Sequence, residues 1–87
     1  DIRDMIIVNN HLKQLISGDI LIDDGLHNLE HWPGIGICFT QPWNKDADVL
    51  RANNWNDVDL LVRTALALLD TGITHKEVER ILKERTL

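Results

Sequence analysis

Three short runs of consecutive apolar residues constrain the fold of this 87-residue chain more than any other feature. The runs are MIIV at 5–8, DILI at 19–22 and IGICFT at 35–40. Each run is short for a helix, and its apolar residues follow one another instead of alternating with polar ones. This pattern is typical of parallel strands that are covered on both faces, so we predict three buried parallel strands.

The clearest helix spans Trp55–Leu69, after a long loop of sequence QPWNKDADVLRANN. Gly72 suits the left-handed position that follows a helix. Thr74 and Glu77 then form the pattern of a capping box, which predicts a last helix over about 75–85. The apolar residues of the first helix recur at helical spacing and form one stripe: Val58, Leu61, Val62, Ala65, Leu66 and Leu69.

Strands followed by helices, with short helical links such as HNLEHW at 27–32, make the layer pattern of an α/β fold. Three parallel strands with so few covering helices would leave an exposed sheet edge and an uncovered face. A chain of this length also buries only a modest core. We therefore expect the second half of a doubly wound α/β domain. The start at Asp1 instead of a methionine fits a missing upstream part.

Two adjacent carboxylates, Asp23 and Asp24, follow the second apolar run and precede Gly25. In open parallel sheets, ligands bind outside the carboxyl ends of the strands. Paired acids at such an end can hold Mg²⁺, with one acid on the ion and its neighbour orienting a bound water or a lysine. The alternative is a simple strand-terminating turn, which Asp-Asp-Gly also favours. The residues alone leave both interpretations open.

The net charge of −5 argues against a nucleic-acid backbone or an anionic membrane as the main partner. No apolar stretch approaches the roughly 20 residues of a membrane span, and no signal peptide is visible. Cys38 is the single cysteine and cannot form an intrachain disulfide, so we expect a buried, reduced thiol. Together these features predict a cytoplasmic protein.

Two further groups of side chains suggest ligands less strongly. His27 and His31 have the i, i+4 spacing that can bind zinc on a helix, and Cys38 is near in sequence. No HExxH pattern accompanies them and Cys38 is expected to point into the core, so we favour solvated histidines. The second group consists of three tryptophans that could line a base-stacking surface, although we favour a role in packing. Its members are Trp32, Trp43 and Trp55.

Several motifs in a fixed order resemble one known family. Lys13 lies ten positions before Asp23, the intervening stretch leads into LIDD, and ICFTQPWN and NNW follow. Over about residues 5–66 this order resembles the C-terminal half of the haloacid dehalogenase (HAD) superfamily, and more closely the 5′(3′)-deoxyribonucleotidase family of pyrimidine deoxynucleotide phosphatases. The resemblance implies that residues 1–72 are the C-terminal part of a HAD-like (Rossmannoid) parallel three-layer α/β domain. Residues 73–87 would add a capped helix that completes a C-terminal helical hairpin.

The resemblance also implies roles for three residues. Asp24 is expected to be the Mg²⁺ ligand, and Asp23 its partner, close to the ion and to the lysine. Lys13 is expected to contact the phosphate and to stabilise a nucleophilic aspartate. The implied reaction transfers the phosphoryl group of a nucleoside monophosphate to that aspartate, and water then releases phosphate.

The first motif of the family, a strand ending in Asp-x-Asp that supplies the nucleophile and the general acid, is not found before Lys13. The Asp-x-Asp triplets at 46–48 and 57–59 come after the acid pair and follow no buried strand. The chain alone is therefore expected to be inactive. We expect activity only with a partner, either the missing N-terminal half or another subunit. The exposed sheet edge also suggests homo-oligomers.

The alternative hypothesis is a non-catalytic HAD remnant that serves as a binding or assembly module. Its contact surface would be the C-terminal helical hairpin. On this hypothesis no phosphate is released even when the missing half is present.

Overall fold

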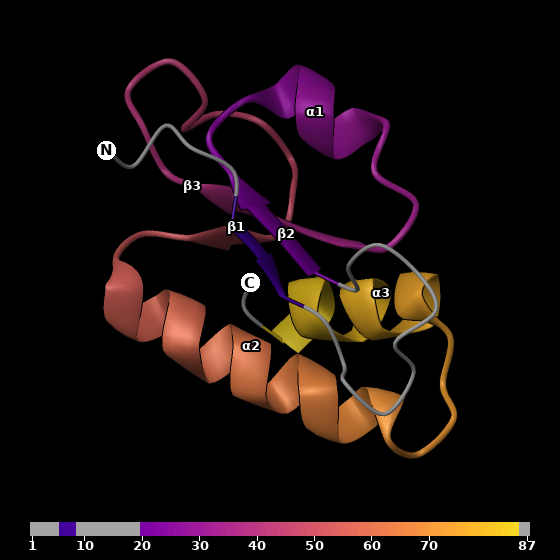
Figure 1. Cartoon of the computed structure of the whole chain (residues 1–87). Helices are drawn as coiled ribbons and strands as arrows, with labels where there is room; N and C mark the ends of the chain where they lie inside the picture. The colour runs from indigo at the N-terminus through magenta and orange to yellow at the C-terminus, as the bar shows by residue number, and fades with distance from the viewer. Residues whose placement is uncertain (1–5, 9–19, 86–87) are drawn as a thin grey trace.

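The computed structural model describes residues 6–8 and 20–85 of the chain (Figure 1). These residues form a mixed four-stranded sheet in the order β1-β2-β3-β4. The strands are β1 (Ile6–Val8), β2 (Ile20–Asp23), β3 (Ile35–Phe39) and β4 (Arg51–Ala52). The helices are α1 (Leu26–Glu30), α2 (Trp55–Leu69) and α3 (His75–Arg85). The α/β class predicted from the sequence is confirmed.

The central strands β2 and β3 are parallel, and Asp23 pairs with Cys38 near their carboxyl ends. All four residues of β2 are buried, as expected of a strand covered on both faces. β4 lies parallel to β3, within the segment predicted to be a loop. Its two residues, Arg51 and Ala52, carry too little apolar pattern for a strand to be recognised in the sequence.

β1 runs antiparallel to β2, so the prediction that residues 5–8 form a third parallel strand is wrong. Ile6 pairs with Ile22, and Val8 pairs with Ile20. Residues 9–19 connect the two strands, whereas a parallel crossover needs a dozen or more residues. An antiparallel return suits a connection of this length. A run of apolar residues thus indicates a strand but not its direction.

The two long helices begin and end where the sequence predicts. The Asn54 side chain accepts a hydrogen bond from the Asp57 N–H at 2.9 Å and caps the start of α2. After α2, Gly72 adopts a φ of +92°, which a residue with a β-carbon reaches only with strain. The Thr74 hydroxyl accepts a hydrogen bond from the Glu77 N–H at 3.2 Å, which is one of the two hydrogen bonds of the predicted capping box.

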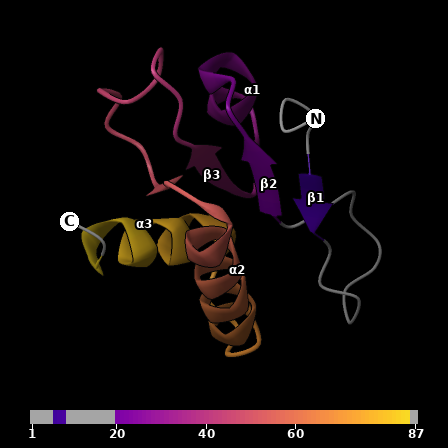
Figure 2. The same ribbon diagram turned by 90° about the vertical axis from the view of Figure 1, so that its left-hand side faces the viewer.

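Helices α2 and α3 cover one face of the sheet, and the short α1 lies on the other side (Figure 1, Figure 2). On the α1 side, a β-carbon on Gly36 would come within 3.2 Å of the Leu29 side chain, so a larger residue at this position of β3 would require Leu29 to shift. The core between the sheet and the long helices contains Ile20, Ile22, Ile35, Ile37, Leu50, Ala52, Val58, Leu61, Ala65, Leu69, Val78 and Leu82.

Backbone N–H groups along the edge of β3 that faces β4 donate hydrogen bonds to two different partners. Near the carboxyl end of β3, the Cys38 N–H donates to the Leu50 carbonyl at 2.8 Å, next to β4. Nearer the start of β3, the Gly36 N–H donates to Glu79 Oε2 at 2.8 Å. Glu79 belongs to α3, so this helix pairs with the edge where β4 does not reach.

The outward face of α3 is charged. Arg80 pairs with both Glu77 and Glu84, and its hydrogen bond lowers the pKa of the Glu77 carboxyl. Exposed pairs of this kind contribute little to stability. Within the part of the chain that the structure describes, no helix reaches the length and apolarity of a membrane span.

Candidate functional site

Asp23 and Asp24 lie at the carboxyl end of β2 and are almost fully buried, with 3% and 8% of their surfaces exposed. Asp23 uses both of its carboxylate oxygens within the chain. Oδ1 accepts a hydrogen bond from the Gly25 N–H at 3.1 Å, and Oδ2 accepts one from Asn28 Nδ2 at 2.8 Å. Asp23 therefore makes the predicted turn and also ties α1 to the strand end.

Asp24 differs from its neighbour because its Oδ2 is buried and has no hydrogen-bond partner among the described residues. A buried carboxylate oxygen without a partner is destabilising. Such an oxygen, at the ligand-binding end of a parallel strand and beside a second acid, is the donor that a hard divalent cation prefers. The residues present therefore fit Mg²⁺, since Asp24 offers a buried carboxylate oxygen without a partner among the described residues and Asp23 is held in place beside it.

Asn44, in the loop after β3, joins the ends of the two central strands. Its side chain is fully enclosed, with 1% of its surface exposed. Nδ2 donates to the carbonyls of Asp24 at 3.0 Å and Phe39 at 3.1 Å, while Oδ1 accepts from the Gln41 N–H at 2.9 Å. The sequence contained Asn44 in the Gln-Pro-Trp-Asn element, but its role in holding the Asp24 backbone was not predicted.

Arg51 holds the loop that carries Asn44. From β4, its guanidinium donates to the Asn44 carbonyl at 2.9 Å and to the Ala47 carbonyl at 2.7 Å. It also donates to the Thr40 hydroxyl at 3.0 Å. Sequence analysis missed Arg51, because nothing local shows that a basic residue in a polar loop turns back onto that loop.

Cys38 lies beside Asp23 in the sheet and is fully buried, as predicted. Burial raises the pKa of the Cys38 thiol, because the thiolate would lose its hydration. The Arg51 charge lowers this pKa, whereas the charges of Asp24 and Asp23 raise it further. The thiol therefore stays protonated at neutral pH and is a packing residue of the site.

The aromatic residues around the strand ends are more exposed than predicted. Trp43 is 68% exposed, so the interpretation of this residue as a packing anchor is wrong. Trp55 is 48% exposed and its ring contacts Phe39 at a centroid distance of 5.0 Å. Trp43 follows a proline in a loop whose buried contacts are made by the next residue, Asn44, which leaves the indole outside.

Neither Asp-x-Asp triplet directly follows a strand. In the first, Asp48 pairs with Lys83 of α3 at 3.2 Å. In the second, Asp57 accepts a hydrogen bond from the Asn53 N–H at the start of α2. Both aspartates have structural partners, and the expectation that neither triplet supplies a nucleophile stays a prediction.

The remaining predicted residues have different outcomes. Lys13 lies outside the described residues, so its contact with phosphate stays a prediction. His27 and His31 are exposed on α1 and at its end, and exposure alone does not distinguish solvated histidines from metal ligands. Of the three site residues suggested by the resemblance, the structure brings Asp23 and Asp24 together at one strand end.

Comparisons with known proteins identify the family to which the chain is similar. A family model described as "5' nucleotidase, deoxy (Pyrimidine), cytosolic type C protein" matches residues 1–68. The 5′(3′)-deoxyribonucleotidases of Bacillus subtilis (strain 168) and of Bacillus phage SPbeta are each 42% identical over 48 residues. Each match covers 54% of this chain and 28% of the relative, so the chain spans less than a third of the length of these relatives. No solved structure gives a significant match.

The family match covers the strands of the sheet, α1 and most of α2, and it includes the acid pair. The mixed α/β fold with its small parallel sheet is consistent with a partial HAD-like domain. The family model matches residues 1–68, which is more than half of the chain. The chain therefore belongs to the deoxy (pyrimidine), cytosolic type C family of HAD-like 5′-nucleotidases.

Proposed function

We propose that this chain supplies the metal-binding acid and the phosphate-contacting lysine of a Mg²⁺-dependent phosphatase acting on deoxyribonucleoside monophosphates. The observation that carries the proposal is Oδ2 of Asp24, which is buried at the end of a parallel strand and has no hydrogen-bond partner among the described residues. A hard divalent cation satisfies such an oxygen and keeps further positions for water and phosphate oxygens. Family membership supports the substrate class, since both curated relatives are named 5′(3′)-deoxyribonucleotidases.

Each residue of the site has one task in this proposal. Asp24 holds the cation through Oδ2. Asp23, whose carboxylate is fixed by Gly25 and Asn28, adds a second negative charge that favours a cation over other occupants. Asn44 fixes the backbone at Asp24, so that the ligand does not move away from the strand end. When bound, Mg²⁺ neutralises charge on the phosphate.

In this proposal a second polypeptide segment supplies the nucleophilic aspartate. It is either an N-terminal segment of a longer chain or a separate subunit. The support is that no Asp-x-Asp precedes Lys13 in the sequence, and that the triplets at 46–48 and 57–59 hold structural partners. Lys13 contacts the phosphate, as the family resemblance implies.

The proposed setting is the cytoplasm, where the buried Cys38 thiol stays reduced. Neither nucleic acid nor a membrane takes part, since the net charge of −5 is unfavourable for an anionic polymer or surface. The substrate phosphate is also anionic, and the cation held by Asp24 overcomes that repulsion locally.

The test combines the chain with a segment that carries a strand-borne Asp-x-Asp motif, in the presence of Mg²⁺ and dUMP. Inorganic phosphate is expected from the complex and not from either part alone. Asp24→Asn keeps the size of the side chain but weakens the metal ligand, so the rate is expected to fall at least about 100-fold.

Asp46→Asn is the matched control, because Asp46 is exposed in the loop and belongs to the first Asp-x-Asp triplet. Its rate is expected to equal that of the parent complex. A folded complex that releases no phosphate would overturn the proposal and favour the non-catalytic binding module. An Asp24→Asn complex with full activity would show that the acid pair is only a turn.

A further inference from the structure

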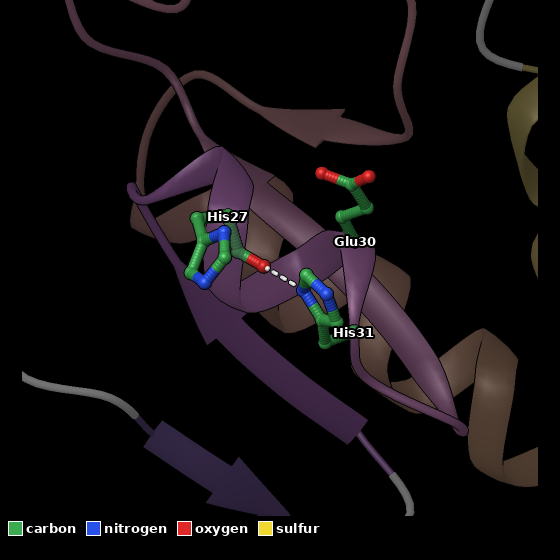
Figure 3. A group of neighbouring side chains, drawn as sticks. All are labelled: His27, Glu30 and His31. Atoms are coloured by element: carbon green, nitrogen blue, oxygen red, sulfur yellow. Dashed lines mark hydrogen bonds between the residues drawn. The ribbon is translucent and has the colours of Figure 1, made fainter.

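A second group of metal-ligand side chains lies on α1, outside the acid pair. His27, Glu30 and His31 are exposed, and one ligand atom from each lies within 4.8 Å of the others. The two imidazole rings are one helical turn apart, with centroids separated by 4.6 Å (Figure 3). We call these three residues the α1 cluster.

The hydrogen bond of His31 fixes which ring nitrogen is available. His31 Nδ1 lies 3.0 Å from the His27 carbonyl oxygen (Figure 3). A carbonyl oxygen only accepts hydrogen bonds, so Nδ1 carries the proton of a neutral ring and Nε2 keeps its lone pair. Histidines that bind metals commonly donate their other N–H to a backbone carbonyl in this way. His31 is therefore prepared as a metal ligand.

We propose that the α1 cluster binds one divalent transition-metal ion of the zinc class. The ligands are the imidazoles of His27 and His31 and the carboxylate of Glu30, with water in the remaining position. A tetrahedral zinc site with bonds of about 2.0–2.2 Å places its ligand atoms roughly 3.3–3.5 Å apart. Rotation of these three exposed side chains closes the remaining gap.

This site differs in chemistry from the acid pair. Two imidazole nitrogens favour Zn²⁺, Co²⁺, Ni²⁺ or Cu²⁺, whereas the oxygens of Asp24 favour Mg²⁺. Asn28 links the two sites: it lies between His27 and Glu30 in the sequence, and its side chain donates a hydrogen bond to Asp23. An ion that bridges His27 and His31 holds the turn of α1 that contains Asn28. The inference goes beyond the phosphatase proposal and does not depend on it.

The test is a calorimetric titration of the full chain, prepared without a histidine tag, with Zn²⁺. One tightly bound ion per chain is expected, and Co²⁺ is expected to give the intense visible absorption of a four-coordinate site. His27→Gln and His31→Gln should each weaken the Zn²⁺ affinity at least about tenfold. Glu30→Gln should weaken it less, because both imidazole ligands stay in place.

His75→Gln and Asp24→Asn are the controls, one for a histidine outside the cluster and one for the acid pair. Both should leave the Zn²⁺ affinity unchanged. Unaltered binding in a His27→Gln/His31→Gln chain, loss of binding in Asp24→Asn, or no saturable binding would each overturn the proposal. Amide NMR of the unmodified chain gives a second measurement that needs no variant. Zn²⁺ should shift the signals of residues 26–31 first, and a first response elsewhere would also contradict the site.

Discussion

Asn44 and Asp24 are in contact in the site, and their buried side-chain atoms differ in hydrogen bonding. Asn44 hydrogen-bonds through both ends of its amide, whereas Asp24 leaves Oδ2 without a partner among the described residues. A satisfied buried amide stabilises one arrangement of the chain, while an unsatisfied acid lowers stability. Such local conflict is common where a residue serves a ligand. Asn44 is therefore a structural residue of the site, whereas Asp24 is the proposed cation ligand.

Removing the Asn44 amide is expected to destabilise the fold strongly. Asn44→Ala leaves the Asp24 and Phe39 carbonyls and the Gln41 N–H without their partner. The free energy of unfolding should fall by about 2–3 kcal/mol, as measured by urea denaturation. Asn56→Ala, at an exposed position of α2, is the control and should change it by less than about 0.5 kcal/mol. Equal effects of the two substitutions would show that Asn44 does not join the strand ends.

The Cys38 thiol makes stability depend on alkaline pH. Burial, with a further contribution from the acid pair, raises its pKa in the folded chain above that in the unfolded chain. The unfolded chain therefore loses this proton at lower pH. The stabilising effect is complete below the unfolded pKa of about 8.5, and it is lost as pH rises towards the folded pKa.

Between about pH 8 and about pH 10 the free energy of unfolding should fall because of this group. Urea denaturation at several pH values measures the change. Cys38→Ala should remove most of the decline, and the absence of tyrosine from the sequence keeps phenol ionisation out of this range. An identical decline in both proteins would assign it to other groups.

Among the elements, α2 was predictable and β4 was not, for a physical reason. Val58, Leu61 and Ala65 repeat at helical spacing, so local sequence determines both the helix and its buried face. β4 depends on hydrogen bonds from Cys38 and from Thr40, which lie more than ten positions earlier. No local sequence pattern predicts such a pairing. The direction of β1 likewise cannot be predicted from its own residues, because it depends on the connection to β2.

The residues of the site also differ in whether local sequence could predict their roles. The acid pair was predictable because it directly follows an apolar run. The burial of Asn44 was not, because it requires the loop after β3 to fold over the ends of two strands. The contact of Arg51 with that loop likewise appears only in three dimensions.

The attachment of α3 to the sheet edge gives a prediction at the level of elements. Glu79→Ala removes the acceptor of the Gly36 N–H, which β4 does not replace. The free energy of unfolding should fall by about 2 kcal/mol, the usual value for a hydrogen bond to a charged group. Glu79→Gln keeps an oxygen acceptor and should lose less. Glu84→Ala, on the exposed face of the same helix, should change stability by less than about 0.5 kcal/mol. An equal loss in the Glu84 variant would attribute the effect to the helix and not to the edge.

The molecule as a whole is unevenly covered in its described part. Two long helices pack on one face of the sheet, and the five-residue α1 lies on the other (Figure 2). The outer strands have three and two residues, so they protect the edges of the central strands only over short lengths. Short strands limit edge-to-edge pairing, and in the described part of the chain β1 and β4 are the outer strands, whose far edges pair with no further strand.

The isolated chain is therefore expected to self-associate through its sheet edge, and a complementary segment should suppress this association. Such a segment would occupy the same edge and contribute the strand that carries the nucleophile. Sedimentation equilibrium should give an average mass that rises with concentration for the chain alone. The mixture with the complementary segment should instead give the mass of one copy of each. The comparison is informative because both outcomes involve the same backbone groups. A strictly monomeric chain that unfolds in one cooperative transition would contradict the idea that its sheet is open to a partner, whatever ions the acid pair binds.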